Sequence, residues 1–434
     1  MANNKKDRNR ANQNLRDMNT YPLFTTKSIE PLFNVFLDKI EYDKYRFKRN
    51  RKFNFKSVLC LLIATVVSGT YTIANTTNTY SGKSIFGFNF AEFSKQAFFK
   101  RLKFISPKIF KFILFNNFVK KSKNNVNLNN ICVSTKTLRQ FKKIVKIDLT
   151  TLDKTPKGKL NIKTSSKNRQ HYELLGGVVL TMTDLITEKL HEIIYSKKAS
   201  RNDLTFKNDI LKAVKKGYLL CFDRGYNSHN FFNELTEKGV SFIMPKYSSS
   251  KYKIIKTLYS DNFISDKLVF LGSQGHEVLK PVRLISVKVG KYTYDYITNV
   301  SSIDILNPKE VFMLYKRRWN IEKTFNYVKR NLNLSYMWSS DYTIVETQVY
   351  ITFIVYTVMV DLIRKTAISL EIDQDRISFN MIKKSFFQFS QQNKYNIIDF
   401  LCLKAKKLGI IKSIRNFQIK KQEEIYLAFC ESCF

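Results

Sequence analysis

The first third of the chain carries apolar residues at helical spacing. Residues 29–40 show this spacing, and residues 55–67 form an apolar run that predicts a buried helix. Residues 90–102 predict a short basic helix, and Ser106-Pro107 supplies an N-cap and a first-turn proline for a second one. This pair suits a DNA-reading unit and, equally, a plain helical bundle.

After residue 140 the pattern changes to strands that alternate with helices. Gly217 and Gly239 are placed to end two helices, and Ser228 to begin the second of them. Three strands in succession, then helix, strand, helix and strand, give a mixed α/β sheet flanked by helices. The expected strands cover 143–152, 172–182, 190–195, 218–222 and 241–244, and the expected helices cover 203–216 and 228–238.

Residues 246–300 predict a β-rich insertion. Strand-like stretches cover 268–271, 282–289 and 292–298, with a turn at Gly290-Lys291 between the last two. Asn307-Pro308-x-Glu310 then predicts the capped start of a helix. The later stretch 344–363 is apolar but includes charged residues, which favours a buried helix over a membrane span.

The charge balance points to an anionic partner. The 434 residues include 74 Lys and Arg against 35 Asp and Glu, a formal net charge of +39, while 44% of the chain is hydrophobic. A folded protein with this excess repels itself unless nucleic acid or another polyanion offsets it. The six cysteines are scattered, and Cys430 and Cys433 form one isolated CxxC pair, so we expect reduced thiols and no zinc site. These features predict a cytoplasmic, nucleoid-associated protein with no membrane partner.

One helix concentrates polar residues of three chemical kinds. At 100° per residue, Tyr315, Arg318, Glu322 and Lys329 fall within about 60° of one another. An apolar stripe lies beside them, which includes Ile321 and Val328. A helix that holds a metal-binding carboxylate among phosphate-gripping neighbours would have this arrangement.

Two further acids stand where strands would present them. Asp148 interrupts the apolar face of the first strand, and Asp223 directly follows the fourth, at the place where open α/β sheets hold ligands. If Asp148, Asp223 and Glu322 converged, their mutual repulsion would favour divalent cations. Hard oxygen ligands and only four histidines indicate two Mg²⁺ or Mn²⁺ ions that clamp a scissile phosphate.

Each acid also has a plainer interpretation. Asp148 could belong to a strand-end turn, with Asp153 as the competing candidate. Asp223 could pair with Arg224 or cap its turn. Glu322 could form a surface pair with Arg318 one helical turn away.

The motif Tyr315-x2-Arg318-x3-Glu322-x6-Lys329 resembles the YREK signature of bacterial insertion-sequence DDE transposases. The strand order is similar to their ribonuclease-H-like core, and Asp223-Arg224-Gly225-Tyr226 is similar to their second-aspartate region. The resemblance implies a catalytic and metal-binding triad of Asp148, Asp223 and Glu322. It also implies that Tyr315, Arg318 and Lys329 contact DNA phosphates. The context of Asp148 departs most from the family pattern.

The expected organisation follows from this resemblance. A helical DNA-binding region would occupy 1–140, the ribonuclease-H-like core 141–245 and 301–365, the insertion 246–300, and a basic helical region 366–434. Some relatives stack an extruded base on a tryptophan of the insertion. Neither tryptophan here lies in it, so Tyr292 or Tyr294 would have to serve.

We therefore expect a transposase that cuts double-stranded DNA at its element's ends and joins the 3′-hydroxyl to target DNA. Pairing of two ends predicts a homodimer on DNA. Two alternatives remain: a non-catalytic DNA-binding regulator derived from a transposase, and a metal-dependent nuclease of the same fold.

Overall fold

The chain forms two compact units, which we call the helical unit and the sheet unit. The helical unit comprises Met1–Ser122, Asp153–Lys159 and Asn326–Phe434, and the sheet unit comprises Lys123–Leu152 and Leu160–Phe325. The expectations for residues 29–40 and for Cys430 and Cys433 lie outside the described residues. The computed structural model describes residues 55–70, 72–85, 88–120, 133–155, 175–272, 278–392 and 397–412.

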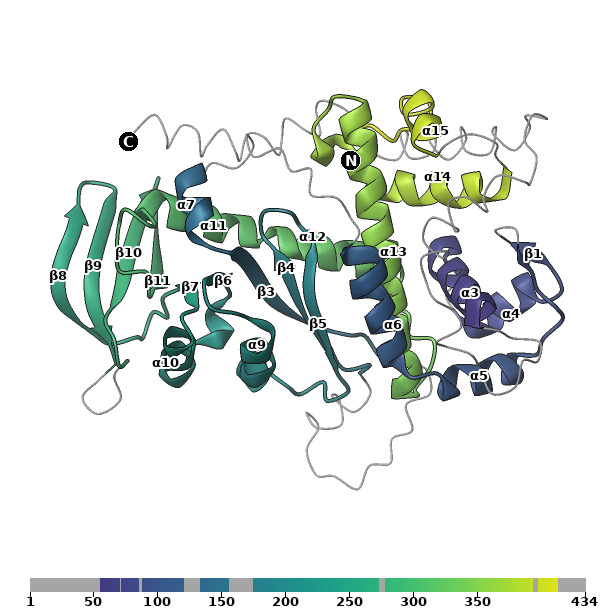
Figure 1. Cartoon of the computed structure of the whole chain (residues 1–434), viewed down its shortest axis with the longest axis horizontal. Coiled ribbons are helices and arrows are strands. Elements are labelled where there is room, and N and C mark those ends of the chain that lie inside the picture. The colour runs from purple at the N-terminus through teal and green to yellow at the C-terminus, as the bar shows by residue number, and fades with distance from the viewer. Residues whose placement is uncertain are drawn as a thin grey trace, which may run out of the picture. The chain divides into compact units, whose positions relative to one another are not determined.

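A nine-stranded mixed sheet organises the sheet unit (Figure 1). β3 pairs in parallel with β6, and β6 with β7, while the other neighbours are antiparallel. The expected mixed α/β class is thus confirmed. In spatial order the strands are β5 (Leu190–Ser196), β4 (Val178–Asp184), β3 (Lys143–Thr151), β6 (Tyr218–Cys221), β7 (Ser241–Pro245), β11 (Tyr292–Thr298), β10 (Val282–Val289), β9 (Ile264–Leu271) and β8 (Tyr252–Ser260).

The β-rich insertion extends the same sheet. β11 adds to β7, and β10, β9 and β8 follow outward from it. Strand β8 was not predicted from the sequence. It is the edge strand, and eight of its nine residues are exposed, so it lacks the alternation of buried and exposed residues that marks a half-buried strand.

Two helices cover one face of this sheet, α9 (Lys207–Ala213) and α10 (His229–Glu237) (Figure 1). Ser228 caps α10 as predicted, because its hydroxyl accepts from the amide of Phe231. Gly217 follows α9 and Gly239 follows α10, with positive φ angles of 87° and 68°. Only glycine adopts such angles at little cost in energy. The core of this face includes Val145 and Ile147 from β3, Phe206, Ile210, Phe231, Phe232, Phe242 and Met244.

The opposite face carries α11 (Pro308–Arg318), which packs near β6, β7 and β10. The sequence predicted one helix through residue 329, and this was wrong. The helix stops at Trp319 and resumes as α12 (Asn320–Asn326), which a π-helical turn, η8 (Tyr327–Asn331), follows. At the interruption, the Trp319 amide donates to the Lys316 carbonyl, and the Glu322 amide donates to the Trp319 carbonyl. Each of these hydrogen bonds spans three residues, as in a 3-10 helix.

In the helical unit, α13 (Tyr342–Ser369) is long and apolar enough to cross a membrane by length and composition, but 78% of its most apolar window is buried. The expected buried helix is therefore confirmed. Ser106 precedes α6 at the N-cap position, but its side chain makes no capping bond. The remaining described helices of this unit are α3 (Phe55–Ser68), α4 (Ile73–Tyr80), α5 (Lys95–Phe104), α6 (Pro107–Ile113), η4 (Leu114–Val119), η9 (Gln374–Arg376), α14 (Phe379–Gln392) and α15 (Ile397–Leu403); β1 (Ser84–Ile85) pairs with β2 (Phe88–Asn89).

Candidate active site

Two of the predicted acids meet at the carboxyl edge of the parallel strands. The parallel pairing of β3 with β6 ends where Lys146 stands opposite Cys221, and Asp148 and Asp223 each follow two residues later, close enough for the charge of Asp223 to act on Asp148. Val145 and Ile147 point into the core under α9 and α10. Alternation along the strand therefore turns Asp148 towards the face that carries α11. The sheet thus places both carboxylates at one edge.

Burial and charge act strongly on Asp148. Burial raises the pKa of its carboxyl to about 6, the Arg318 guanidinium opposes this rise, and the charges of Asp223 and Asp203 add to it. The Asp148 Oδ1 also accepts a hydrogen bond of 2.9 Å from the Leu149 amide. Asp148 therefore sits among other acids in a partly desolvated place, where a cation would be favoured.

Arg318 provides the positive charge at this edge. Its Nη1 lies 3.4 Å from the Asp148 Oδ2, and its guanidinium lies 5.3 Å from the centre of the Tyr315 ring. Both side chains are nearly buried, with 6% of Tyr315 and 5% of Arg318 exposed. Arg318 is thus brought to Asp148 with Tyr315 beside the guanidinium, and the Arg318–Glu322 pair that the sequence allowed is replaced by Arg318–Asp148.

The start of α11 is held by a capping box and by a more distant segment. Asn307 accepts from the Glu310 amide, and the Glu310 carboxylate accepts from the Asn307 amide, as the sequence predicted. Glu310 also accepts hydrogen bonds from the Ser134 amide and from the Thr137 hydroxyl at the start of α7 (Thr135–Gln140). These bonds fix the helix that carries Tyr315 and Arg318.

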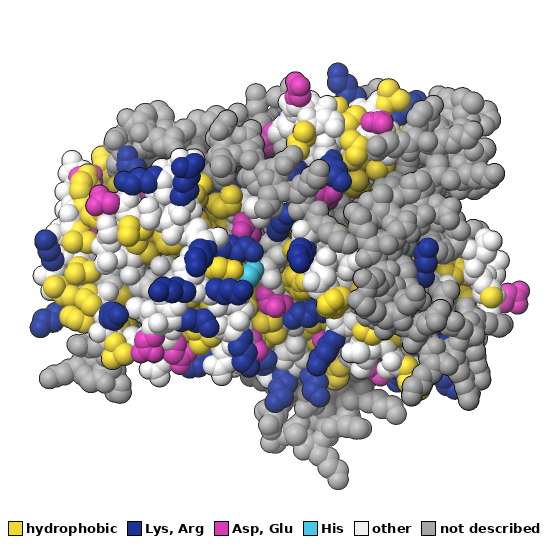
Figure 2. Space-filling view, in the orientation of Figure 1, with side chains coloured by type: hydrophobic (Ala, Val, Ile, Leu, Met, Phe, Trp, Pro, Cys, Tyr) yellow, Lys and Arg dark blue, Asp and Glu magenta, His cyan; other side chains and the backbone are white. Residues whose placement is uncertain are grey.

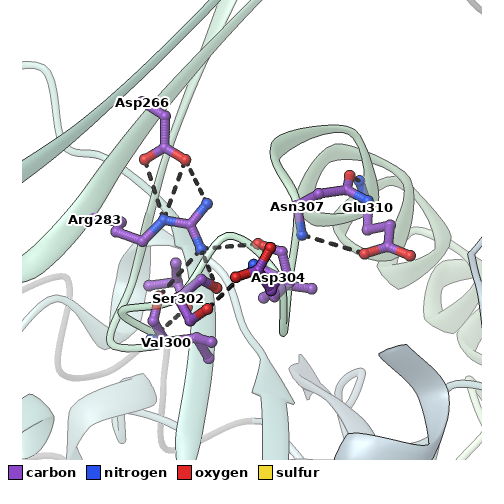
Figure 3. Close-up of polar contacts among 9 residues, drawn as sticks. Asp266, Arg283, Val300, Ser302, Asp304, Asn307 and Glu310 are labelled. Atoms are coloured by element: carbon purple, nitrogen blue, oxygen red, sulfur yellow. Dashed lines mark hydrogen bonds and ion pairs between the residues drawn. The ribbon is translucent and has the colours of Figure 1, made fainter. Parts of the chain in front are cut away.

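A buried arginine in the insertion secures the loop before α11 (Figure 3). Arg283 on β10 is fully buried, pairs with Asp266 on β9, and donates from Nη1 to the carbonyls of Val300, Ser302 and Leu306. These three carbonyls precede the cap at Asn307. The insertion therefore helps to position the helix of the candidate site, a link that sequence reasoning missed.

Sequence reasoning also missed Asp203, the first residue of η6 (Asp203–Phe206). The charge of Asp203 acts on Asp148. Burial raises the pKa of the Asp203 carboxyl, and the charge of Asp223 adds to this rise. Tyr226 lies beside these acids in η7 (Arg224–Tyr226), fully buried. The sequence does show Asp203 at the start of a predicted helix that follows a strand. Only the strand order shows that Asp203 lies at the same edge of the sheet as Asp148.

Glu322 is placed differently from the two aspartates. It stands in the first turn of α12 with an exposed side chain, and the charges that act on Asp148 come from Arg318, Asp223 and Asp203. Among the described residues, no three His, Cys, Asp or Glu side chains are arranged closely enough to hold a metal ion. The role of Glu322 stays a prediction.

Lys329 and Asp153 belong to the helical unit. Lys329 is half-buried in η8, and burial lowers the pKa of its ammonium, while Asp153 opposes this. Asp153 is exposed. The alternative that made Asp153 the first acid has less support than Asp148, because Asp148 feels the charge of Asp223 and pairs with Arg318.

The candidate base-stacking tyrosines lie on β11. Tyr292 is 59% exposed and Tyr294 is 42% exposed, and the Tyr294 ring lies 5.7 Å from the Phe312 ring of α11. Both rings are accessible, and their role stays a prediction.

The donor chemistry at the edge fits a hard divalent cation. The acids offer carboxylate oxygens alone, in a partly buried setting, and the buried Tyr226 hydroxyl beside them lies near the Asp203 carboxylate without reaching ordinary hydrogen-bond geometry. Asp148, Asp203 and Asp223 are the described residues whose carboxylates lie near this edge, and they would have to move closer together to share a cation, because their arrangement in the free protein does not form a metal site.

Comparison with known proteins adds a family. The family described as "Transposase DDE domain" matches residues 139–358, more than half of the chain. A protein of Sinorhizobium fredii that is provisionally named a transposase, y4zB, is 27% identical over 154 residues. That similarity covers 34% of this chain and 43% of the relative, so the two share less than half of either length.

Proposed function

We propose that this chain, which belongs to the transposase DDE domain family, cuts DNA at the ends of its own insertion element. It would then join the freed 3′-hydroxyl to target DNA. The observation that carries this proposal is the convergence of Asp148 and Asp223 at one edge of the sheet, beside Arg318. Members of the family generally use divalent metals.

The three predicted acids would divide the work. Asp148 and Asp223 would hold cations at the edge of a ribonuclease-H-like core, and exposed Glu322 would complete the set when DNA binds. Two Mg²⁺ or Mn²⁺ ions there would supply activation of an attacking oxygen and stabilisation of a leaving one. The same residues can serve cleavage by water and joining by a 3′-hydroxyl, because both are in-line displacements at phosphorus.

The basic residues would orient the DNA. Lys329 would contact a phosphate near the element end, as would Tyr315 and Arg318, although Arg318 is engaged with Asp148 in the free protein. The net charge of +39 supports a DNA partner of large extent. Figure 2 shows Lys and Arg side chains with fewer acids over the face that α9 and α10 cover. We further propose a homodimer on DNA, at the nucleoid in the cytoplasm.

A cleavage assay on the element's own terminal repeat tests the proposal. The wild type is compared with Asp223→Asn and Glu322→Gln in Mg²⁺, with Glu237→Gln, an exposed acid of α10, as the control. Both site variants should lose cleavage and joining by about a hundredfold or more while binding the terminal repeat as the wild type does. The control should cleave normally.

Three outcomes would contradict the proposal. Cleavage retained in Asp223→Asn would remove the proposed centre. Binding of the repeat by the wild type without cleavage would indicate a non-catalytic regulator. Cleavage without joining would indicate a nuclease of the same fold.

A further inference from the structure

Asp203 reaches the edge of the sheet by a route that the topology makes clear. β3 is antiparallel to β4 and β4 to β5, so β5 runs parallel to β3. The chain leaves β5 at Ser196 and enters η6 at Asp203. Asp203 therefore stands at the carboxyl edge, where Asp148 and the Asp223 turn also lie.

Gly225 shows how closely the two loop acids approach. A Cβ added to Gly225 would lie 2.3 Å from the Asp203 Oδ2 and 3.1 Å from the Asp223 Oδ1. The Gly225 amide donates to that same Asp223 Oδ1 at 2.8 Å. Position 225 requires glycine because the two carboxylates leave no room for a Cβ atom. A positive φ angle is not the reason.

Tyr226 adds an independent sign of a missing partner. Its hydroxyl is fully buried and makes no hydrogen bond of ordinary geometry, although the Asp203 carboxylate is near. The rings of Phe222 and Phe231, with centroids at 5.4 Å and 6.4 Å, hold its ring in place. A buried hydroxyl without a partner costs roughly 1–3 kcal/mol, so a bound state in which it gains one would explain its position.

Ordinary structural duties do not account for Asp203. The helical N-cap is Asn202, whose side chain accepts from the Thr205 amide. The nearby Arg201 instead pairs with Asp209, at 3.2 Å. Asp203 thus neither caps this helix nor pairs with Arg201. Its negative charge beside Asp223 therefore raises the free energy of the metal-free protein.

We infer that Asp203 is a further carboxylate of the divalent-cation centre and that Tyr226 is the residue that positions it. The inference rests on the proposed function, since it assigns a residue to the same centre. Three acids from β3, the η6 start and the β6 turn would offset the charge of two cations better than Asp148 and Asp223 alone. On loading, a small movement of the Asp203 carboxylate would give the Tyr226 hydroxyl an acceptor.

Titration of the full-length protein with Mn²⁺, without DNA, tests this inference. Calorimetry gives the affinity, and thermal unfolding gives the melting temperature with and without Mn²⁺. Asp203→Asn should weaken Mn²⁺ binding by about tenfold or more. It should also raise the melting temperature of the metal-free protein, because a repelling charge is lost. A structural role would lower that temperature.

Three variants complete the experiment. Asp209→Asn, which removes the neighbouring surface acid, should bind Mn²⁺ as the wild type does. Tyr226→Phe should weaken binding less than Asp203→Asn. Gly225→Ala should displace the Asp203 carboxylate and weaken binding, and it should add little in the Asp203→Asn background.

The outcomes separate this inference from the proposed function. Wild-type Mn²⁺ affinity in Asp203→Asn, with loss in Asp223→Asn, would overturn the inference and leave the proposed centre standing. Wild-type affinity in both variants would overturn both. If Asp203→Asn lowers the melting temperature of the metal-free protein, or fails to fold, while Gly225→Ala folds and binds Mn²⁺ normally, Asp203 is structural and the inference fails.

Discussion

Arg318 contacts Asp148 across 170 residues of sequence, with Nη1 and Oδ2 separated by 3.4 Å. Only 6% of the Arg318 side chain and 18% of the Asp148 side chain are exposed. A partly buried pair of this kind stabilises little as a whole, but removal of one partner leaves the other charge uncompensated. The pair joins the first strand of the sheet to the helix of the polar stripe.

Arg318→Met should therefore destabilise the protein by about 3 kcal/mol at pH 8. The loss should shrink at pH 5, where Asp148 is protonated and needs no partner. Urea unfolding at the two pH values measures both effects, and the double variant with Asp148→Asn should recover part of the loss. Equal losses at pH 5 and pH 8 would contradict the expected coupling.

The raised pKa of Asp148 predicts a pH dependence of stability. Its value of about 6 exceeds the ordinary value of 3.8, so the folded protein holds this proton more tightly than the unfolded chain. The resulting stabilisation is complete below pH 3.8 and is lost as the pH rises through about 6. Asp148→Asn avoids this loss.

We expect the stability of Asp148→Asn relative to the wild type to rise by on the order of 2–3 kcal/mol between pH 4 and pH 7. Chemical unfolding in a metal chelator, at several pH values, measures this difference. A difference that does not vary with pH would show that Asp148 titrates normally. Glu237→Gln serves as the exposed control and should show no such trend.

Arg283 should be needed for the stability of the sheet unit and for the position of α11. Arg283→Met leaves Asp266 buried without its partner and removes one hydrogen-bond donor from each of three carbonyls, so we expect a loss of about 3–5 kcal/mol. The double variant Arg283→Met/Asp266→Leu should lose less, because no buried charge remains. Urea unfolding of the wild type, the single variant and the double variant tests this. A double variant with a lower free energy of unfolding than Arg283→Met would contradict it.

Lys329 should contribute to DNA affinity in a sequence-independent way. Lys329→Ala should weaken binding and reduce the slope of log affinity against log salt by about one. Fluorescence anisotropy on the terminal repeat and on unrelated DNA measures both quantities. Lys406→Ala, an exposed lysine beyond α15, is the control. A slope unchanged by Lys329→Ala would remove the proposed phosphate contact.

Much of the sheet could be predicted because its signals are local. The continuously apolar run of β6, the alternation in β3 and the Gly290 turn between β10 and β11 each depend on neighbouring residues. The capping box of α11 is likewise set within four residues. Strand β8 escaped prediction because an exposed edge strand needs no buried face.

The composition of the site was less accessible from the sequence. Asp148 and Asp223 could be selected by their positions on strands, since strand ends present side chains at an edge. Asp203 could not, because its approach to Gly225 depends on the order in which β3, β5 and β6 pair. The helical wheel placed Glu322 with Arg318 by assuming an unbroken helix, and the interruption at Trp319 invalidates that assumption.

By itself, the sequence determined the elements of the sheet, the charge that favours a nucleic-acid partner, and a short set of acids, because periodicity, capping and composition act within a few residues. Only the tertiary structure decided which acids share an edge, that Arg318 pairs with Asp148 and not with Glu322, and that Arg283 ties the insertion to α11. These relationships join segments far apart in the chain, and packing and strand pairing select them.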